Sequence, residues 1–103
     1  MPLGTQSLPR RSERIFVRLP VTLLVDSDRE RIAQDAFTVD LSQLGVRVRT
    51  DLALAPGQAI DVFPNRGLKH PIPSRVIWVG EHGAPQYGEA GLEFMRPLGG
   101  GNA

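Results

Sequence analysis

Hydrophobic and polar residues alternate along residues 37–49, which read FTVDLSQLGVRVR. The apolar side chains take every second position on either side of Gly45, namely Phe37, Val39, Leu41, Val46 and Val48. Successive side chains of a strand point to opposite faces, so this pattern predicts two half-buried strands joined by a turn.

The rest of the chain repeats this pattern of short alternating segments separated by turn residues. Further strands are expected over residues 19–25, around Ile60 and Val62, over 74–79 and over 87–94. Residues 29–35 favour a helix by composition but are too few for a stable one, so a hairpin tip that leads into a strand is expected there. Six or seven strands at a spacing of about ten residues, with no convincing helix, predict an antiparallel β-barrel or sandwich. Closure into a barrel would also remove exposed strand edges.

The side chains that fill the interior follow from the same period of two. The predicted core comprises Val21, Leu23, Val39, Leu41, Val46, Val48, Ile60, Val62, Ile77, Leu92 and Phe94. Asp40 and Ser42 alternate with two of these residues, so they are expected on the outer face. Gly45 can take a positive φ that would expose nearby backbone amides to a ligand. The alternative is a plain turn in which Asp40 and Ser42 cap backbone amides.

Length and composition define the class of protein. A chain of 103 residues is one domain. We expect a disordered tail over residues 1–9, a domain over 10–96 that begins with a basic arm over 10–18, and a flexible glycine-rich tail over 97–103. No apolar run is long enough for membrane insertion and no signal peptide opens the chain, so a cytoplasmic protein is expected. Because there is no cysteine, thiol catalysis and cysteine-based metal sites are excluded.

The side chains offer little support for catalysis. The two histidines, His70 and His82, both stand in turn-like contexts, and the carboxylates are scattered. A metal site would need a third ligand in close geometry, and no glycine-rich phosphate loop is present. We therefore expect neither an enzyme nor a metal or cofactor site.

The basic residues are distributed unevenly along the chain. Eleven of the twelve are arginines, and Arg10, Arg11, Arg14 and Arg18 fall within nine residues that contain one acid, Glu13. Arginine suits planar, bidentate contacts with phosphate groups and guanine edges. The segment is expected to be a flexible arm that closes over a ligand, or else a basic tail that aids solubility.

Two segments of the chain together resemble the PilZ domain family. Residues 14–21 read RIFVRLPV and residues 40–45 read DLSQLG. They are similar to the family's RxxxR motif, which precedes the first strand, and to its [DN]xSxxG motif, which follows about one hairpin later. Further similar stretches are PGQ at 56–58, RVIW at 75–78 and GEAGLEF at 88–94, so the resemblance spans about residues 10–96.

The resemblance implies a fold and a ligand. The fold is a six-stranded antiparallel β-barrel with a flexible N-terminal arm and little or no C-terminal helix, and the ligand is the bacterial second messenger cyclic di-GMP. Carried over residue by residue, Arg14 and Arg18 form the arginine pair. The second motif is formed by Asp40, Ser42 and Gly45. Trp78 lies where some members place an aromatic side chain against a guanine.

The arginine motif departs from the family's pattern in two ways. Arg10 and Arg14 form a second, overlapping RxxxR frame, so either frame can be the working one. Glu13 stands where members that bind two stacked ligand molecules often carry an arginine. This acid favours a single bound ligand, unless Arg10 or Arg11 compensates for it.

Three functions fit these residues to different degrees. The first is a receptor whose arm orders on cyclic di-GMP and alters the surface seen by an unidentified downstream protein. The second is a PilZ-like interaction module that does not bind nucleotide, and the two intact motifs argue against it. The third is a single-strand nucleic-acid barrel, which fits poorly because the six aromatic residues are scattered along the chain. No DNA or RNA partner is therefore expected.

Overall fold

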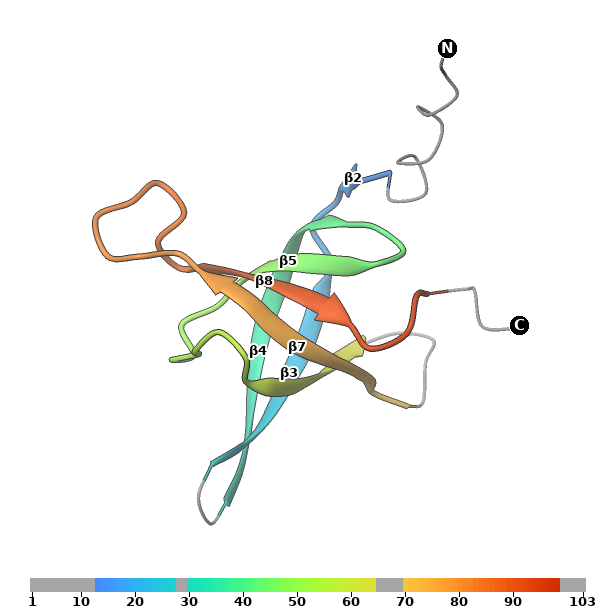
Figure 1. The fold of residues 1–103 in the computed structure, drawn as a ribbon, viewed down its shortest axis with the longest axis horizontal. Helices are drawn as coiled ribbons and strands as arrows, with labels where there is room; N and C mark the ends of the chain where they lie inside the picture. The colour runs from blue at the N-terminus through green and yellow to red at the C-terminus, as the bar shows by residue number, and fades with distance from the viewer. Residues whose placement is uncertain (1–12, 28–29, 65–69, 99–103) are drawn as a thin grey trace.

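The computed structural model describes residues 13–27, 30–64 and 70–98, which form strands, turns and loops (Figure 1). The strands are β2 (Ile15–Phe16), β3 (Pro20–Ser27), β4 (Glu30–Leu41), β5 (Gly45–Arg49), β6 (Ala59–Pro64), β7 (Ile72–Val79) and β8 (Glu89–Phe94). These ranges contain no helix, and so none that is long and apolar enough to span a membrane.

Six of the strands close into a barrel. In ring order they are β3, β4, β5, β8, β7 and β6; all neighbours are antiparallel, and β6 pairs back with β3. The two-residue strand β2 is additional and pairs with the end of β4. The predicted six-stranded antiparallel barrel is therefore confirmed, and the sandwich alternative is not.

The hairpin of β3 and β4 is longer than the sequence pattern indicated. The two strands pair continuously from Pro20 opposite Phe37 to Ser27 opposite Glu30, and in Figure 1 they extend beyond the other strands. Residues 29–35 were expected to form a hairpin tip that leads into a strand; the strand is confirmed, and it begins already at Glu30. Pairing with a neighbouring strand overrides the weak helix propensity of this segment.

The core confirms most of the predicted interior. Eight predicted residues are buried: Val21, Leu23, Val46, Val48, Ile60, Val62, Leu92 and Phe94. Leu41 is partly buried and packs against them. Val25, Ala36, Val76 and Ala90 complete the buried apolar cluster.

Val39 and Ile77 were wrong predictions, and both errors have the same cause. The pairing of β4 with β5 shifts register after Thr38, and the pairing of β7 with β8 shifts after Val76. Each shift leaves one extra residue, a β-bulge, which reverses the in–out alternation beyond it. Thr38 and Val76, the residues just before the two bulges, therefore point into the core and are 4% and 1% exposed. Ile77 is itself the extra residue of its bulge and is 49% exposed.

Candidate functional site

An outward-facing row of residues crosses five strands beside the two bulges. Phe16 pairs with Asp40, Asp40 with Arg47, Arg47 with Gly91, and Gly91 with Trp78. Residues that pair across neighbouring strands share a face of the sheet. The row therefore places a carboxylate, a guanidinium group and two aromatic side chains on one patch of the outer face.

A cleft of about 600 Å³ lies over this row. Its lining consists of Arg14, Phe16, Asp40, Ser42, Leu44, Gly45, Val46, Arg47, Ile77, Trp78, Gly91, Leu92 and Glu93. The cleft thus brings together five of the residues predicted for the site, with Arg14 from the arm, Trp78 from β7 and the rest from the β4–β5 hairpin. Arg18 is not part of the lining, and Arg10 and Arg11 lie outside the described residues.

Ser42 organises the turn between β4 and β5. Its Oγ accepts hydrogen bonds from the backbone N–H groups of Leu44 at 3.1 Å and Gly45 at 3.2 Å. Its own backbone N–H donates to the carbonyl oxygen of Gly45 at 2.9 Å. For Ser42, the structure thus contains the amide-capping turn that was the alternative interpretation of this motif.

The reason for a glycine at position 45 differs from the one expected. The glycines of positive φ in the described ranges are Gly57, Gly83 and Gly88, so Gly45 does not take the positive φ that was open to it. A Cβ at Gly45 would lie 2.3 Å from the carbonyl oxygen of Leu92 on β8. Close approach of the neighbouring strand, rather than backbone conformation, therefore requires the glycine.

Asp40 faces away from the core, as predicted, but it is covered rather than exposed. Its Oδ1 accepts a hydrogen bond from Arg14 Nη1 at 2.8 Å, and its Oδ2 lies 2.8 Å from Arg47 Nη2. The Asp40 side chain is 3% exposed, whereas that of Arg14 is 58% exposed. Each carboxylate oxygen thus contacts a guanidinium group. Arg14 is the more exposed of the two arginines and covers Asp40 on the solvent side.

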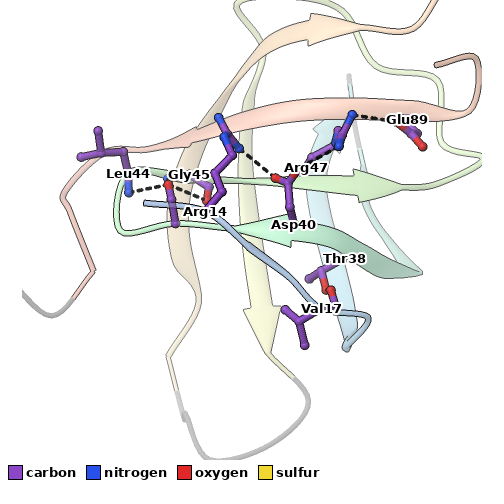
Figure 2. A network of polar contacts seen from close by, with 9 residues as sticks. Arg14, Val17, Thr38, Asp40, Leu44, Gly45, Arg47 and Glu89 are labelled. Atoms are coloured by element: carbon purple, nitrogen blue, oxygen red, sulfur yellow. Dashed lines mark hydrogen bonds and ion pairs between the residues drawn. The ribbon is translucent and has the colours of Figure 1, made fainter. Parts of the chain in front are cut away.

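The ion pairs continue along β5 to β8 (Figure 2). Arg47 Nη1 lies 3.5 Å from Glu89 Oε1. Glu89 Oε2 also accepts a hydrogen bond from Arg49 Nη2 at 2.7 Å. Three guanidinium groups and two carboxylates leave the network with one net positive charge. Asp40 and Glu89 are both nearly buried, so removing an arginine partner from either would leave a poorly solvated charge.

Arg14 and Arg18 have different surroundings in spite of their shared motif. The Arg18 guanidinium lies over the ring of Phe37, 4.0 Å from its centroid, a cation–π arrangement. An extended chain advances about 3.3 Å per residue, so two side chains four positions apart are separated by roughly 13 Å. Because of this separation the two arginines have different partners: Arg14 contacts Asp40, and Arg18 lies on the ring of Phe37.

The arm is docked along β4 from Ile15 to Leu19. The backbone N–H of Val17 donates to the carbonyl oxygen of Val39 at 3.3 Å, and Leu19 exchanges hydrogen bonds with Thr38. The Thr38 hydroxyl also donates to the carbonyl oxygen of Val17. The part of the arm that the structure describes therefore lies on the barrel rather than free of it.

Sequence reasoning missed Arg47, Glu89 and Gly91 as site residues. The outward position of Arg47 was readable from its alternation with Val46 and Val48. Its partner Glu89 lies 42 positions later in the chain, and only the β5–β8 register brings the two together. Local periodicity contains no signal for a contact of this kind.

Comparison with known proteins bears on the fold and on the family. The family model described as PilZ domain matches residues 9–101. Among solved structures, the chain is similar to the PilZ domain of CeSA from a cellulose-synthesizing bacterium, with a TM-score of 0.59 and 23% identity over 81% of this chain and 80% of that one. That likeness supports the fold alone. A search of curated proteins found no match.

PilZ domains are binding modules, generally receptors for cyclic di-GMP, and not typically enzymes. With a match over nearly its whole length, this chain belongs to the PilZ domain family.

Proposed function

We propose that the chain is a receptor that binds cyclic di-GMP in the cleft over β4, β5, β8 and β7. The observation that carries this proposal is the content of the cleft, where Arg14, Asp40 and Trp78 meet although they are far apart in the sequence. A cation, a carboxylate and an aromatic ring are the three kinds of group that a guanine dinucleotide requires.

The chemistry of the ligand matches these groups one by one. Guanine presents N7 and O6 as acceptors, which an arginine such as Arg14 meets in a bidentate manner. Its N1–H and N2 amine are donors, and the Asp40 carboxylate can accept from both. The Trp78 ring can stack on the base. The two phosphate groups of the ligand are neutralised by the surrounding arginines.

Binding requires an exchange of partners at Asp40. Its carboxylate is covered by Arg14, so a guanine can reach Oδ1 only when Arg14 moves away. Asp40 then exchanges Arg14 for the donors of the guanine, and Arg14 becomes free to contact the ligand. Arg47 can stay in place on Oδ2 throughout, because it is also paired with Glu89. Both oxygens of Asp40 therefore still accept hydrogen bonds after the exchange.

The movement of Arg14 supplies the output of the receptor. Arg14 precedes β2, so its displacement pulls on the segment that is docked on β4. Arg18 can leave the Phe37 ring in the same movement and reach the ligand, and Arg10 and Arg11 are proposed to follow. The rearranged arm is the surface that an unidentified downstream protein would recognise in the cytoplasm, where second messengers act.

Calorimetric titration of the protein with cyclic di-GMP, beside cyclic di-AMP as a comparator, tests this function. Adenine has no N1–H and no N2 amine, so we expect its dinucleotide to bind at least about tenfold more weakly. Equal affinities for the two nucleotides, or no heat with cyclic di-GMP, would contradict the proposal.

The second function, a PilZ-like interaction module without nucleotide, is favoured by one observation. The carboxylates of Asp40 and Glu89 are already fully paired with arginines of the chain itself. Carboxylates that are already paired in this way do not need a ligand. The absence of binding in the titration above would select this alternative.

A further inference from the structure

Gly91 of β8 lies directly beneath the indole ring of Trp78. A Cβ placed on Gly91 would be 2.1 Å from Trp78 Nε1 and 2.6 Å from both Cδ1 and Cε2. Cδ1 and Cε2 flank Nε1 and are only slightly farther away than Nε1, whereas an approach in the plane of the ring would leave them much farther away; the face of the five-membered ring therefore covers the glycine. No side chain larger than hydrogen fits at this position while the indole is in place.

The backbone does not require this glycine. Gly91 is in the middle of a strand, and it is not one of the described glycines with a positive φ. A glycine inside a strand weakens the strand, and its presence often indicates that another group approaches closely. The three atoms nearest to a methyl group added at Gly91 would all belong to Trp78, so the indole is the approaching group.

The bulge at Ile77 and the glycine at position 91 act together on the indole. Without the extra residue, the alternation that places Val76 in the core would turn Trp78 inward as well. The bulge turns Trp78 outward, and Gly91 leaves room for its ring to lie flat against β8. We call this contact between Gly91 and the indole the seat. The next residue along the row is Arg47, so the seated ring lies beside the ion-pair network and lines the cleft.

We propose that Gly91 is a positioning residue of the binding site: it seats the Trp78 indole flat on β8, so that the outer face of the ring is presented to the cleft for stacking on a planar base. This inference rests on the proposed function for the identity of the base. The seat itself rests on the contact between Gly91 and Trp78 and can be tested separately.

The variant Gly91→Ala should displace the indole without removing any other side chain from the cleft. We expect the affinity for cyclic di-GMP to fall by about tenfold, the usual size of a lost base–aromatic stack. Trp78 is the only tryptophan in the chain, so its fluorescence reports the displacement directly. The emission of the free Gly91→Ala protein should shift to the red and be quenched more readily by acrylamide.

A double-mutant cycle separates positioning from a general loss of structure. Trp78→Val leaves a normal cross-strand neighbour and retains strand propensity. In that background Gly91→Ala should cause no further loss of affinity or of melting temperature. An equal loss in both backgrounds would overturn the positioning role.

Gly57→Ala is the matched control for destabilisation. Gly57 has a φ of 90° and lies away from the cleft lining, with open space where its Cβ would be. Alanine is strained at that φ, so the melting temperature should fall while affinity and tryptophan emission stay unchanged. If Gly57→Ala weakened binding as much as Gly91→Ala, the effect at Gly91 would be one of stability only.

The two proposals fail in different ways. If the wild-type protein does not bind cyclic di-GMP, the proposed function and the stacking role both fall. The seat is still judged by fluorescence: an unchanged Trp78 emission in Gly91→Ala overturns it, whatever the outcome of the titration. If binding is normal in Gly91→Ala but the emission shifts, the indole is seated by Gly91 but does not stack on the ligand, which overturns the stacking role.

Discussion

At the scale of the residue, Arg14 combines exposure with a specific partner. Its guanidinium group covers Asp40, yet its side chain is 58% exposed. We expect Arg14→Ala to weaken cyclic di-GMP binding by about 1–3 kcal/mol, the usual range for a bidentate guanine contact. Arg14→Lys should recover little of this, because an ammonium group lacks the planar fork. Arg14→Ala also leaves the buried Asp40 carboxylate with Arg47 as its remaining partner, so the free energy of unfolding should fall by about 1–3 kcal/mol.

A matched control for this prediction is available on the far hairpin. Arg31 forms an exposed ion pair with Asp26 and is not part of the cleft lining. Arg31→Ala removes the same charge from the protein and should leave the affinity unchanged. Wild-type affinity in Arg14→Ala, or an equal loss in Arg31→Ala, would refute a specific role for Arg14.

Asp40 distinguishes a site that recognises guanine from one that attracts any anion. Asp40→Asn removes a negative charge close to a dianionic ligand, so a purely electrostatic site would bind more tightly. Because an amide cannot accept two hydrogen bonds from the guanine edge, we expect weaker binding instead. Two arginines also lose their ionic partner, so unfolding should become easier by about 1–3 kcal/mol. Calorimetry and thermal denaturation measure the two effects, and tighter binding would refute the guanine contact.

At the scale of the element, the two bulges decide which side chains face the site. Val76 is 1% exposed and Ile77 is 49% exposed, although the sequence pattern placed Ile77 in the core. Val76→Ala should therefore lower the free energy of unfolding by about 1–4 kcal/mol, and Ile77→Ala by less than about 0.5 kcal/mol. Chemical denaturation of both variants tests the register of β7. Similar losses in the two variants would mean that the bulge is not at Ile77.

The strands could be predicted from the sequence, whereas the bulges could not. The alternation around residues 37–49 and the recurring turn residues are local signals, and they indicated the barrel and most of its core. A bulge depends on how a strand pairs with its neighbour, and nothing in the chain near Val39 or Ile77 reveals that pairing. The motif residues of the site were found through their family pattern. Arg47 and Glu89 were not, because their contact arises from the register of β5 and β8.

At the scale of the whole molecule, the arm and the barrel have different roles in the proposed switch. The arm is held on β4 by a few backbone and hydroxyl hydrogen bonds, such as that from Val17 to Val39, whereas the barrel strands pair all around the ring. Amide hydrogen exchange over residues 15–19 should therefore change when cyclic di-GMP binds, while exchange at Leu23 and Val48 in the core stays the same. Unchanged exchange over residues 15–19 would show that the arm is not the output.

The central claim is that the cleft over the Phe16–Trp78 row is the site of cyclic di-GMP, and an NMR titration of isotope-labelled protein tests it most directly. We expect the backbone amide signals of Asp40 and Gly91 and the single indole N–H signal to shift together and to saturate, while those of the far hairpin around Arg31 do not move. The absence of shifts would contradict the claim. Shifts confined to the apolar cavity at the end of the barrel, which is lined by Phe94 and Leu98 among others, would contradict it too.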